Sequence, residues 1–453
     1  MRTHDKKYIN GFVISLFMAI TAIVISTIND KFSVLYYFGY FLLGIIFLRK
    51  HLVNKKEKDI YIISYSFLFL LSVVLIYHHQ FYYNSPFDAY GDDYRFFCWG
   101  KELQVNNFFT SYSFYEKIIS LIFLIFSVFK IEPNIYQVLP LNILIGSYVV
   151  VLSYRIAFKL TGVDLSKKII FVIMLLNYSF SENVVHLYRD VYIALFSLLF
   201  IIYVNERNNF KTILMIVLTG LFRLPNAIFL IAILPIHQIL LWKKNSIIKS
   251  ILFGSVFLLL FSLSIAAGFK FSKYDMAKSD EIIATRILKF SSSAREAGGG
   301  LAIVNDLPTP VRFVINTYVQ VIRPISIKGI FYPVRESLSH LKIINHKSIG
   351  WAITTITLVF LVGRYISGIT KLVVSRDSGN LIVVLYFIVT TFTIGFLSYL
   401  DRHRVFLIPI FPLVYAFSFS PNRNKFIGFM SSRYFYKISG TLMLIITIGV
   451  SFL

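Results

Sequence analysis

The chain has 453 residues, of which 57% are hydrophobic and only 15% are charged. A soluble domain with so few charges would lack the polar surface that keeps it in solution, so this composition excludes an ordinary soluble protein. The formal net charge is +23, but the Lys and Arg residues lie in short loops between apolar runs rather than in one nucleic-acid-binding patch. The single cysteine, Cys98, excludes an intramolecular disulfide.

Apolar runs recur along the whole chain and predict an all-α, polytopic helical membrane protein with about 13 transmembrane helices. Runs of roughly 15–20 residues approach the ~20 residues that cross a hydrocarbon core of ~30 Å. The predicted helices cover residues 9–27, 33–48, 60–77, 136–158, 168–182, 190–204, 211–222, 225–241, 250–269, 348–366, 380–399, 405–420 and 437–453. We expect a single membrane domain over residues 1–453.

The distribution of basic residues predicts the orientation. With a cytoplasmic N-terminus, one set of loops, including "RKHLVNKKEKD" and "WKKNSIIK", carries at least two basic residues each and is predicted to be cytoplasmic. The run 118–130 is short, and if it crossed, the later basic loops would change side. We therefore expect a re-entrant or interfacial helix there. The predicted extracytoplasmic segments are 78–117, 181–190, 223–226, 270–347 and 401–404.

Several ionisable residues lie at the predicted outer ends of the helices. They are Arg189, Asp190, Arg223, Asp401, Arg402, His403 and Arg404. Ionisable groups at this depth are costly without water or a partner, which makes them functional candidates. Plainer interpretations stay open: a helix-start ion pair of Arg189 with Asp190, an Arg223 that snorkels to the headgroups, and a solvated turn at 401–404.

The stretch "FDAYGDDYRFFCWGKEL", residues 87–103, concentrates acidic and aromatic residues in the first long outer segment. It fits an amphipathic interfacial helix with Asp92 and Asp93 in its first turn. Alternatively, one of these aspartates is a general base that accepts a proton from a sugar hydroxyl. A metal site at the aspartate pair has no supporting ligand spacing.

The second long outer segment, 270–347, contributes two further cations. The stretch "TPVRFVINTYVQVIRPI" fits an amphipathic helix, which places Arg312 and Arg323 on one face because they are eleven residues apart. A packed helix with snorkelled arginines is the alternative. The "GGG" at 298–300 is not preceded by a strand and matches no nucleotide-binding pattern.

The order of these motifs resembles the EpsG and Wzy-type polymerases of bacterial surface polysaccharides. The resemblance rests on "GDDYRFF", "FYEKIISLIFLIFSVF", "SENVVHLYRDVYIALF", "TGLFRLPNAIF" and "DRHRVFLIPIFPL". Matched to the family pattern, the corresponding residues are Gly91, Asp93, Tyr94, Glu116, Arg189, and Arg402 or Arg404. One departure is Arg223, at a position where that group often has a histidine.

The same order is also similar to GT-C membrane glycosyltransferases, whose first outer loop carries an acidic pair. Asp92 and Asp93 would match that pair. Such enzymes usually place this loop after the first helix, whereas here it would follow the third, which favours the polymerase. A lipid-linked oligosaccharide flippase is a third hypothesis, disfavoured because the charges lie at the outer rim rather than at the midplane.

The polymerase resemblance implies metal-independent transfer of a glycan from undecaprenyl diphosphate to a lipid-linked repeat unit, at the periplasmic face of the bacterial inner membrane. Arginine forks suit the diphosphate oxygens, and the implied diphosphate-binding residues are Arg189, Arg223, Arg402, Arg404, Arg312 and Arg323. The implied proton acceptors are Asp93, Asp92 and His403, with Glu116, Asp190 and Asp401 as further site residues. The implied partners are the undecaprenyl-linked oligosaccharide, membrane lipid and a chain-length regulator protein, without nucleic acid and without a cofactor.

Overall fold

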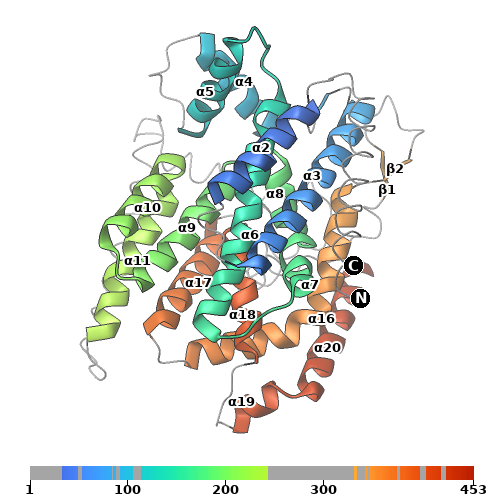
Figure 1. The fold of residues 1–453 in the computed structure, drawn as a ribbon. Helices are drawn as coiled ribbons and strands as arrows, with labels where there is room; N and C mark the ends of the chain where they lie inside the picture. Colours follow the sequence, from blue (N-terminus) through green and yellow to red (C-terminus); the bar gives the residue numbers. More distant parts are fainter. Residues whose placement is uncertain are drawn as a thin grey trace, which may run out of the picture. The chain divides into compact units, whose positions relative to one another are not determined.

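The computed structural model describes residues 33–48, 54–83, 85–87, 92–105, 114–242, 331–333, 342–344, 346–374, 378–397, 405–419 and 425–452. The regular structure in these residues is helical apart from one antiparallel pair of short strands, β1 (Phe331–Pro333) and β2 (Lys342–Ile344), and short turns join the helices. The predicted all-α class is thereby confirmed for this part of the chain (Figure 1).

The chain divides into two compact units. Unit 1 comprises Met1–Tyr148 and Asn183–Arg189, and unit 2 comprises Val149–Glu182 and Asp190–Leu453. The single membrane domain over residues 1–453 stays a prediction, because a division by packing does not say how the chain is placed in a membrane.

Unit 1 contains a helical pair held together by buried tyrosines. Helices α2 (Ser33–Leu48) and α3 (Lys55–Tyr83) are joined by Tyr65, whose hydroxyl donates to the Tyr37 carbonyl at 2.7 Å, and by a 3.1 Å hydrogen bond between the Tyr37 and Ser72 hydroxyls. The Tyr40 hydroxyl donates to the carbonyl of Gln137 at 3.0 Å, in the 3₁₀ turn η1 (Ile135–Gln137) that precedes α6 (Leu139–Thr161). These bonds satisfy polar groups inside an apolar environment.

A hairpin of two short helices, α4 (Asp92–Val105) and α5 (Phe114–Ser127), also belongs to unit 1 (Figure 1). Helix α4 begins at the predicted acidic pair, where carboxylates favour a helix N-terminus. The two helices approach closely at Gly100, because a Cβ there would collide with the Ile119 side chain. Helix α5 has 14 residues, so it is about 21 Å long at 1.5 Å per residue and too short for a ~30 Å core. This length fits the predicted interfacial or re-entrant helix.

Unit 2 is built from antiparallel helices and one long helix. It contains the end of α6, followed by α7 (Lys167–Ile170), the π-helical segment η2 (Phe171–Leu175), α8 (Tyr178–Val185), α9 (Asp190–Asn205), α10 (Asn209–Phe222), α11 (Leu224–Trp242), α16 (His346–Val374), α17 (Ser378–Leu397), η7 (Ile408–Ile410), α18 (Phe411–Phe417), α19 (Lys425–Met430) and α20 (Arg433–Phe452). Helices α9, α10, α11 and α17 pack in succession, and α16 packs on α18 and α20. The last residues of α8 belong to unit 1.

The predicted number of membrane crossings is too high for the described part of the chain. Three helical segments there are long and apolar enough to cross, Lys55–Gln80, Ile135–Thr161 and Ile349–Val374, or four if the pair Lys167–Leu175 and Tyr178–Val185, bent by 75°, is one broken span. The predicted helices 9–27 and 250–269 lie outside the described residues. The coarse assignment as a helical membrane protein is supported, and the number 13 is not.

The physical reason for the excess is that several short apolar runs lie in the protein core. Helix α18 is buried at every residue, and ten residues of α9 are buried. Short apolar helices of this kind pack against protein on most sides, and hydropathy alone cannot distinguish them from short membrane spans.

Candidate functional site

The two aspartates at the start of α4 have different environments. Asp93 is 1% exposed, and its Oδ1 accepts a hydrogen bond from the Tyr94 backbone N–H at 2.8 Å. The Asp92 carboxylate instead forms an ion pair with Arg95 at 3.3 Å on the partly exposed face of the helix. The sequence offers both aspartates as candidates and matches Asp93 to the polymerase pattern. In the fold, Asp93 is the one of the two whose side chain is buried.

A second buried carboxylate comes from the start of α5. Glu116 is 2% exposed, and it follows Tyr115, whose ring lies edge-on to the Phe96 ring of α4 with centroids 5.3 Å apart. Phe96 lies one helical turn after Asp93. The α4–α5 contact therefore buries a carboxylate from each helix on the inner side of the hairpin, where a carboxylate is costly unless it is paired or hydrogen-bonded.

Arg189 reaches the same aromatic contact from a distant part of the sequence. Its guanidinium carbon lies 5.7 Å from the centroid of the Phe96 ring, in cation–π range. The turn that carries Arg189 is held by Asn142, near the start of α6. The Asn142 Nδ2 donates to the carbonyls of His186 at 2.7 Å and Tyr188 at 3.3 Å. The same amide group is hydrogen-bonded to the Tyr115 hydroxyl.

Four segments of unit 1 thus meet in what we call the unit 1 cluster. Its contacts join Phe96, Tyr115, Asn142 and the turn that carries Arg189. We include the buried carboxylates Asp93 and Glu116, which come from the same turns of α4 and α5. It contains two buried carboxylates and one half-buried guanidinium. Helices α4, α5 and α6 all contribute residues from their N-terminal turns, the ends that the sequence predicts to be extracytoplasmic. Transfer of a phosphate-linked sugar needs a cation to stabilise the leaving phosphate and a group that accepts a proton. The cluster contains both kinds of group.

No family model matches this chain. A comparison with curated proteins also finds no match. The chemistry and geometry of the unit 1 cluster are therefore the basis for assigning a function.

Tyr94, which the family pattern also includes, lies on the exposed side of α4. The pKa of its hydroxyl is raised, chiefly by a hydrogen bond with the Cys98 thiol one turn later, then by the electrostatic effect of that thiol and by desolvation. A raised pKa keeps the phenol protonated at neutral pH, so Tyr94 is a poor proton acceptor.

Unit 2 contains a second arrangement of predicted site residues. An Oδ1 of Asp190, at the first position of α9, lies 3.1 Å from Nη1 of Arg223, the residue that ends α10. The side chains are 5% and 24% exposed. The two residues are paired because α9 and α10 are antiparallel, which brings the start of one helix beside the end of the other. This ion pair replaces the interpretation of Arg223 as a residue that only snorkels to headgroups.

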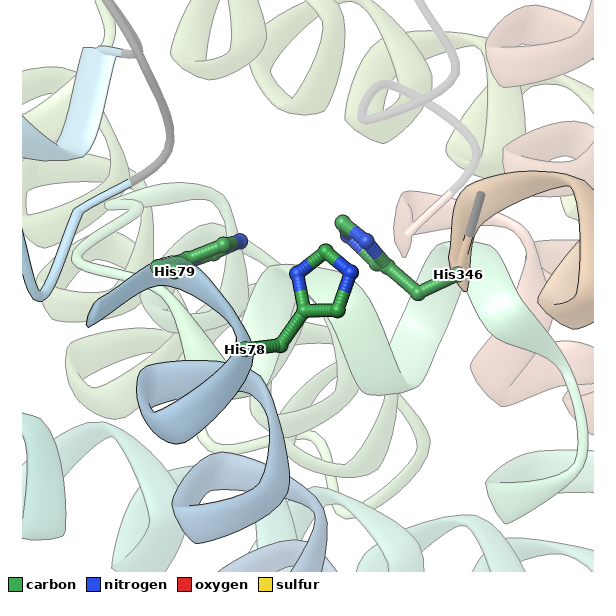
Figure 2. A group of neighbouring side chains, drawn as sticks. All are labelled: His78, His79 and His346. Carbon is green, nitrogen blue, oxygen red and sulfur yellow. The ribbon is translucent and has the colours of Figure 1, made fainter. Parts of the chain in front are cut away.

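Sequence reasoning missed two buried histidines of unit 1. His79, near the C-terminal end of α3, is 1% exposed, and its ring contacts that of His186, 3% exposed, with centroids 5.7 Å apart. Figure 2 shows His78 and His79 on α3; His346, also labelled there, is the first residue of α16 in unit 2. The sequence signal for His79 was "HHQ" directly after an apolar run, because an ionisable side chain at the end of a membrane helix is a functional candidate.

The remaining predicted residues lie outside the described part of the chain. They are Gly91, Arg312, Arg323, Asp401, Arg402, His403 and Arg404. Their roles stay predictions.

Proposed function

We propose that this protein is a polymerase of undecaprenyl-diphosphate-linked saccharide repeat units in bacterial surface polysaccharide synthesis. In this proposal it acts at the periplasmic face of the inner membrane, without a metal ion. The growing glycan is transferred from its diphosphate carrier to a hydroxyl of the incoming lipid-linked repeat unit, with a chain-length regulator as a protein partner.

The observation that carries the proposal is the unit 1 cluster. The sequence resemblance selects Asp93, Glu116 and Arg189 from three segments of the chain, and the fold gathers these segments around the contact of Phe96 with Tyr115. The meeting of these three segments in one unit supports a shared chemical role for the residues.

The roles follow from the chemistry of the step. As the bond between the sugar and the diphosphate breaks, negative charge builds up on the leaving group, and a guanidinium fork stabilises it with paired hydrogen bonds. Arg189 is the proposed fork in unit 1, with Arg223, Arg312, Arg323, Arg402 and Arg404 as further candidates. The attacking hydroxyl must lose a proton, for which the resemblance implies Asp93, Asp92 and His403 as acceptors. Of the two aspartates we favour the buried Asp93, because Asp92 is paired with Arg95 at the surface, and the buried Glu116 is an added candidate.

The decisive test is the glycan pattern of a deletion strain complemented with variants. Loss of a polymerase leaves single repeat units on the carrier lipid, and the wild-type gene restores the ladder. We expect Arg189→Ala to abolish long chains, because a lost charge-assisted bond of roughly 1.5–3 kcal/mol slows each transfer about ten- to hundredfold. Arg95→Ala is the matched control, since Arg95 lies on the exposed side of α4 beside Trp99.

Other patterns would select the rival functions. Full-length chains that lack one sugar, or that carry a truncated repeat, indicate a GT-C transferase with a polyprenyl-phosphate donor. Lipid-linked repeat units that accumulate on the cytoplasmic side of the membrane indicate a flippase. A ladder unchanged by the deletion excludes all three.

A further inference from the structure

The two buried imidazoles of unit 1 form a group that the proposed roles do not use. The His79 and His186 rings are in contact at 5.7 Å with an interplanar angle of 44°. The His186 ring is also stacked with that of Tyr188, with centroids 5.4 Å apart and an interplanar angle of 15°. A row of three rings, His79, His186 and Tyr188, therefore runs from α3 into the turn that carries Arg189.

A hydrogen bond to its backbone carbonyl holds His186 in place. Its carbonyl accepts the 2.7 Å hydrogen bond from Asn142, the residue that is also bonded to the Tyr115 hydroxyl. His186 and Arg189 are three positions apart, a distance of at most about 11 Å along the chain. The imidazole is thus tied to the same scaffold as Glu116 and Arg189.

Imidazole suits proton exchange better than the carboxylates of the cluster. It exchanges protons between about pH 5 and 8, and as a neutral ring it both donates and accepts a hydrogen bond. A neutral base is also less costly in an apolar environment than an ionised carboxylate. Within unit 1, the ring of His78 on α3 contacts that of His79, and the phenol of Tyr188 contacts His186. Asp93 on α4, Glu116 on α5 and Arg189 in the turn are the ionisable groups of the unit 1 cluster.

We propose that the His79–His186 pair, in place of the carboxylates and His403, is the proton acceptor of the transfer reaction, with His186 as the ring that takes the proton and His79 as the positioning residue. The inference rests on the proposed polymerase function. In this step the acceptor hydroxyl loses its proton to a nitrogen of His186, and its oxygen forms the new bond to the anomeric carbon of the donor sugar. The bond from that carbon to the carrier diphosphate breaks, and the diphosphate leaves as an anion beside Arg189.

The test uses the full chain in proteoliposomes, supplied with lipid-linked repeat units extracted from the deletion strain. We expect His186→Ala to retain substrate binding and to lose turnover by roughly 10²–10⁴-fold, the usual contribution of a general base. Added imidazole should restore part of the rate, and this rescue should increase with the fraction of neutral imidazole as the pH rises. A purely structural histidine would show no such rescue. We expect His79→Gln to lower kcat with little change in KM, and to shift the pH at which the remaining activity falls.

His78→Ala is the matched control, because His78 lies next to His79 on α3 but is only half-buried. Elution on size exclusion and the thermal midpoint establish that each variant is folded. A His186→Ala protein with wild-type turnover overturns the inference while leaving the polymerase intact, and so does loss of turnover without imidazole rescue in a folded variant that binds substrate. A wild-type protein that forms no polymer overturns both proposals.

Discussion

The Asp190 carboxylate and the Arg223 guanidinium lie 3.1 Å apart, although the two residues are 33 positions apart in the chain. The pair ties the first turn of α9 to the end of α10. The carboxylate is almost completely buried, so it depends on its partner for stability. An unpaired charge at this place would be costly.

We expect Arg223→Met to destabilise the protein more than Asp190→Asn does, because only the first leaves a buried charge without its partner. Breaking a fully buried pair costs about 3–5 kcal/mol, and we expect less here because the Arg223 side chain is 24% exposed. Thermal unfolding in detergent measures the effect. The double variant Asp190→Leu/Arg223→Met should recover most of the loss, whereas strictly additive losses would show that the two residues do not interact.

The two aspartates at the start of α4 should respond differently to the same isosteric change. Asp93→Asn removes a buried charge within the unit 1 cluster, and we expect it to lower polymer formation at least tenfold. Asp92→Asn breaks only a surface pair with Arg95, which is typically worth no more than about 1 kcal/mol, and should leave the ladder near normal. Equal effects of the two variants on glycan length would contradict the assignment of Asp93 to the site.

Asn142 should matter for function without being chemically reactive. We expect Asn142→Leu to release the turn of residues 186–189, because the carbonyls of His186 and Tyr188 lose their donor. The expected cost is about 1–3 kcal/mol for buried groups left unsatisfied. Hydrogen exchange by mass spectrometry should show faster exchange in this turn, with a parallel loss of polymer. Unchanged exchange would mean that the turn is held by other contacts.

The α4–α5 contact offers a test based on packing alone. Gly100→Ala places a methyl group against the Ile119 side chain, and overpacking of this kind costs about 1–3 kcal/mol. Gly39→Ala on α2 is the control, because a Cβ there meets no atom within 4 Å and alanine favours the helix by about 0.5–1 kcal/mol. We expect the thermal midpoint to fall for the first variant and to hold or rise for the second. The reverse order would refute the close packing of α4 on α5.

A cation–π clamp in unit 2 gives an independent check of the fold. The Arg364 guanidinium carbon of α16 lies 4.3 Å from the ring centroids of both Phe419 and Tyr436, and its Nη1 donates to the Tyr436 hydroxyl at 3.3 Å. We expect Arg364→Ala to lower the free energy of unfolding by about 1–3 kcal/mol. Arg364→Lys should recover only part, because an ammonium group lacks the planar surface that stacks between two rings. A lysine variant less stable than the alanine variant would argue against the clamp.

The sequence alone predicted the local features of this protein correctly. The helix that begins at Asp92 and the one that begins at Asp190 are both present, because a carboxylate at a helix N-terminus acts on backbone groups within one turn. The hairpin around Arg223 is also present, since proline at the second position of α11 permits a helix start and opposes a helix continuation. Such signals involve neighbouring residues only and need no knowledge of the packing.

The tertiary structure decided which distant residues become partners. Sequence patterns offered only the neighbouring Arg189 as a companion of Asp190, and the packing of α9 against α10 adds Arg223, from 33 positions later in the chain. Helix packing likewise separated Asp93 from Asp92 and brought His79 to His186 across 107 positions of the sequence. Hydropathy was also unable to distinguish apolar helices buried in protein from those long enough to cross a bilayer. In each case the outcome depends on contacts between distant segments, whose free energy is not encoded in any short stretch of the chain.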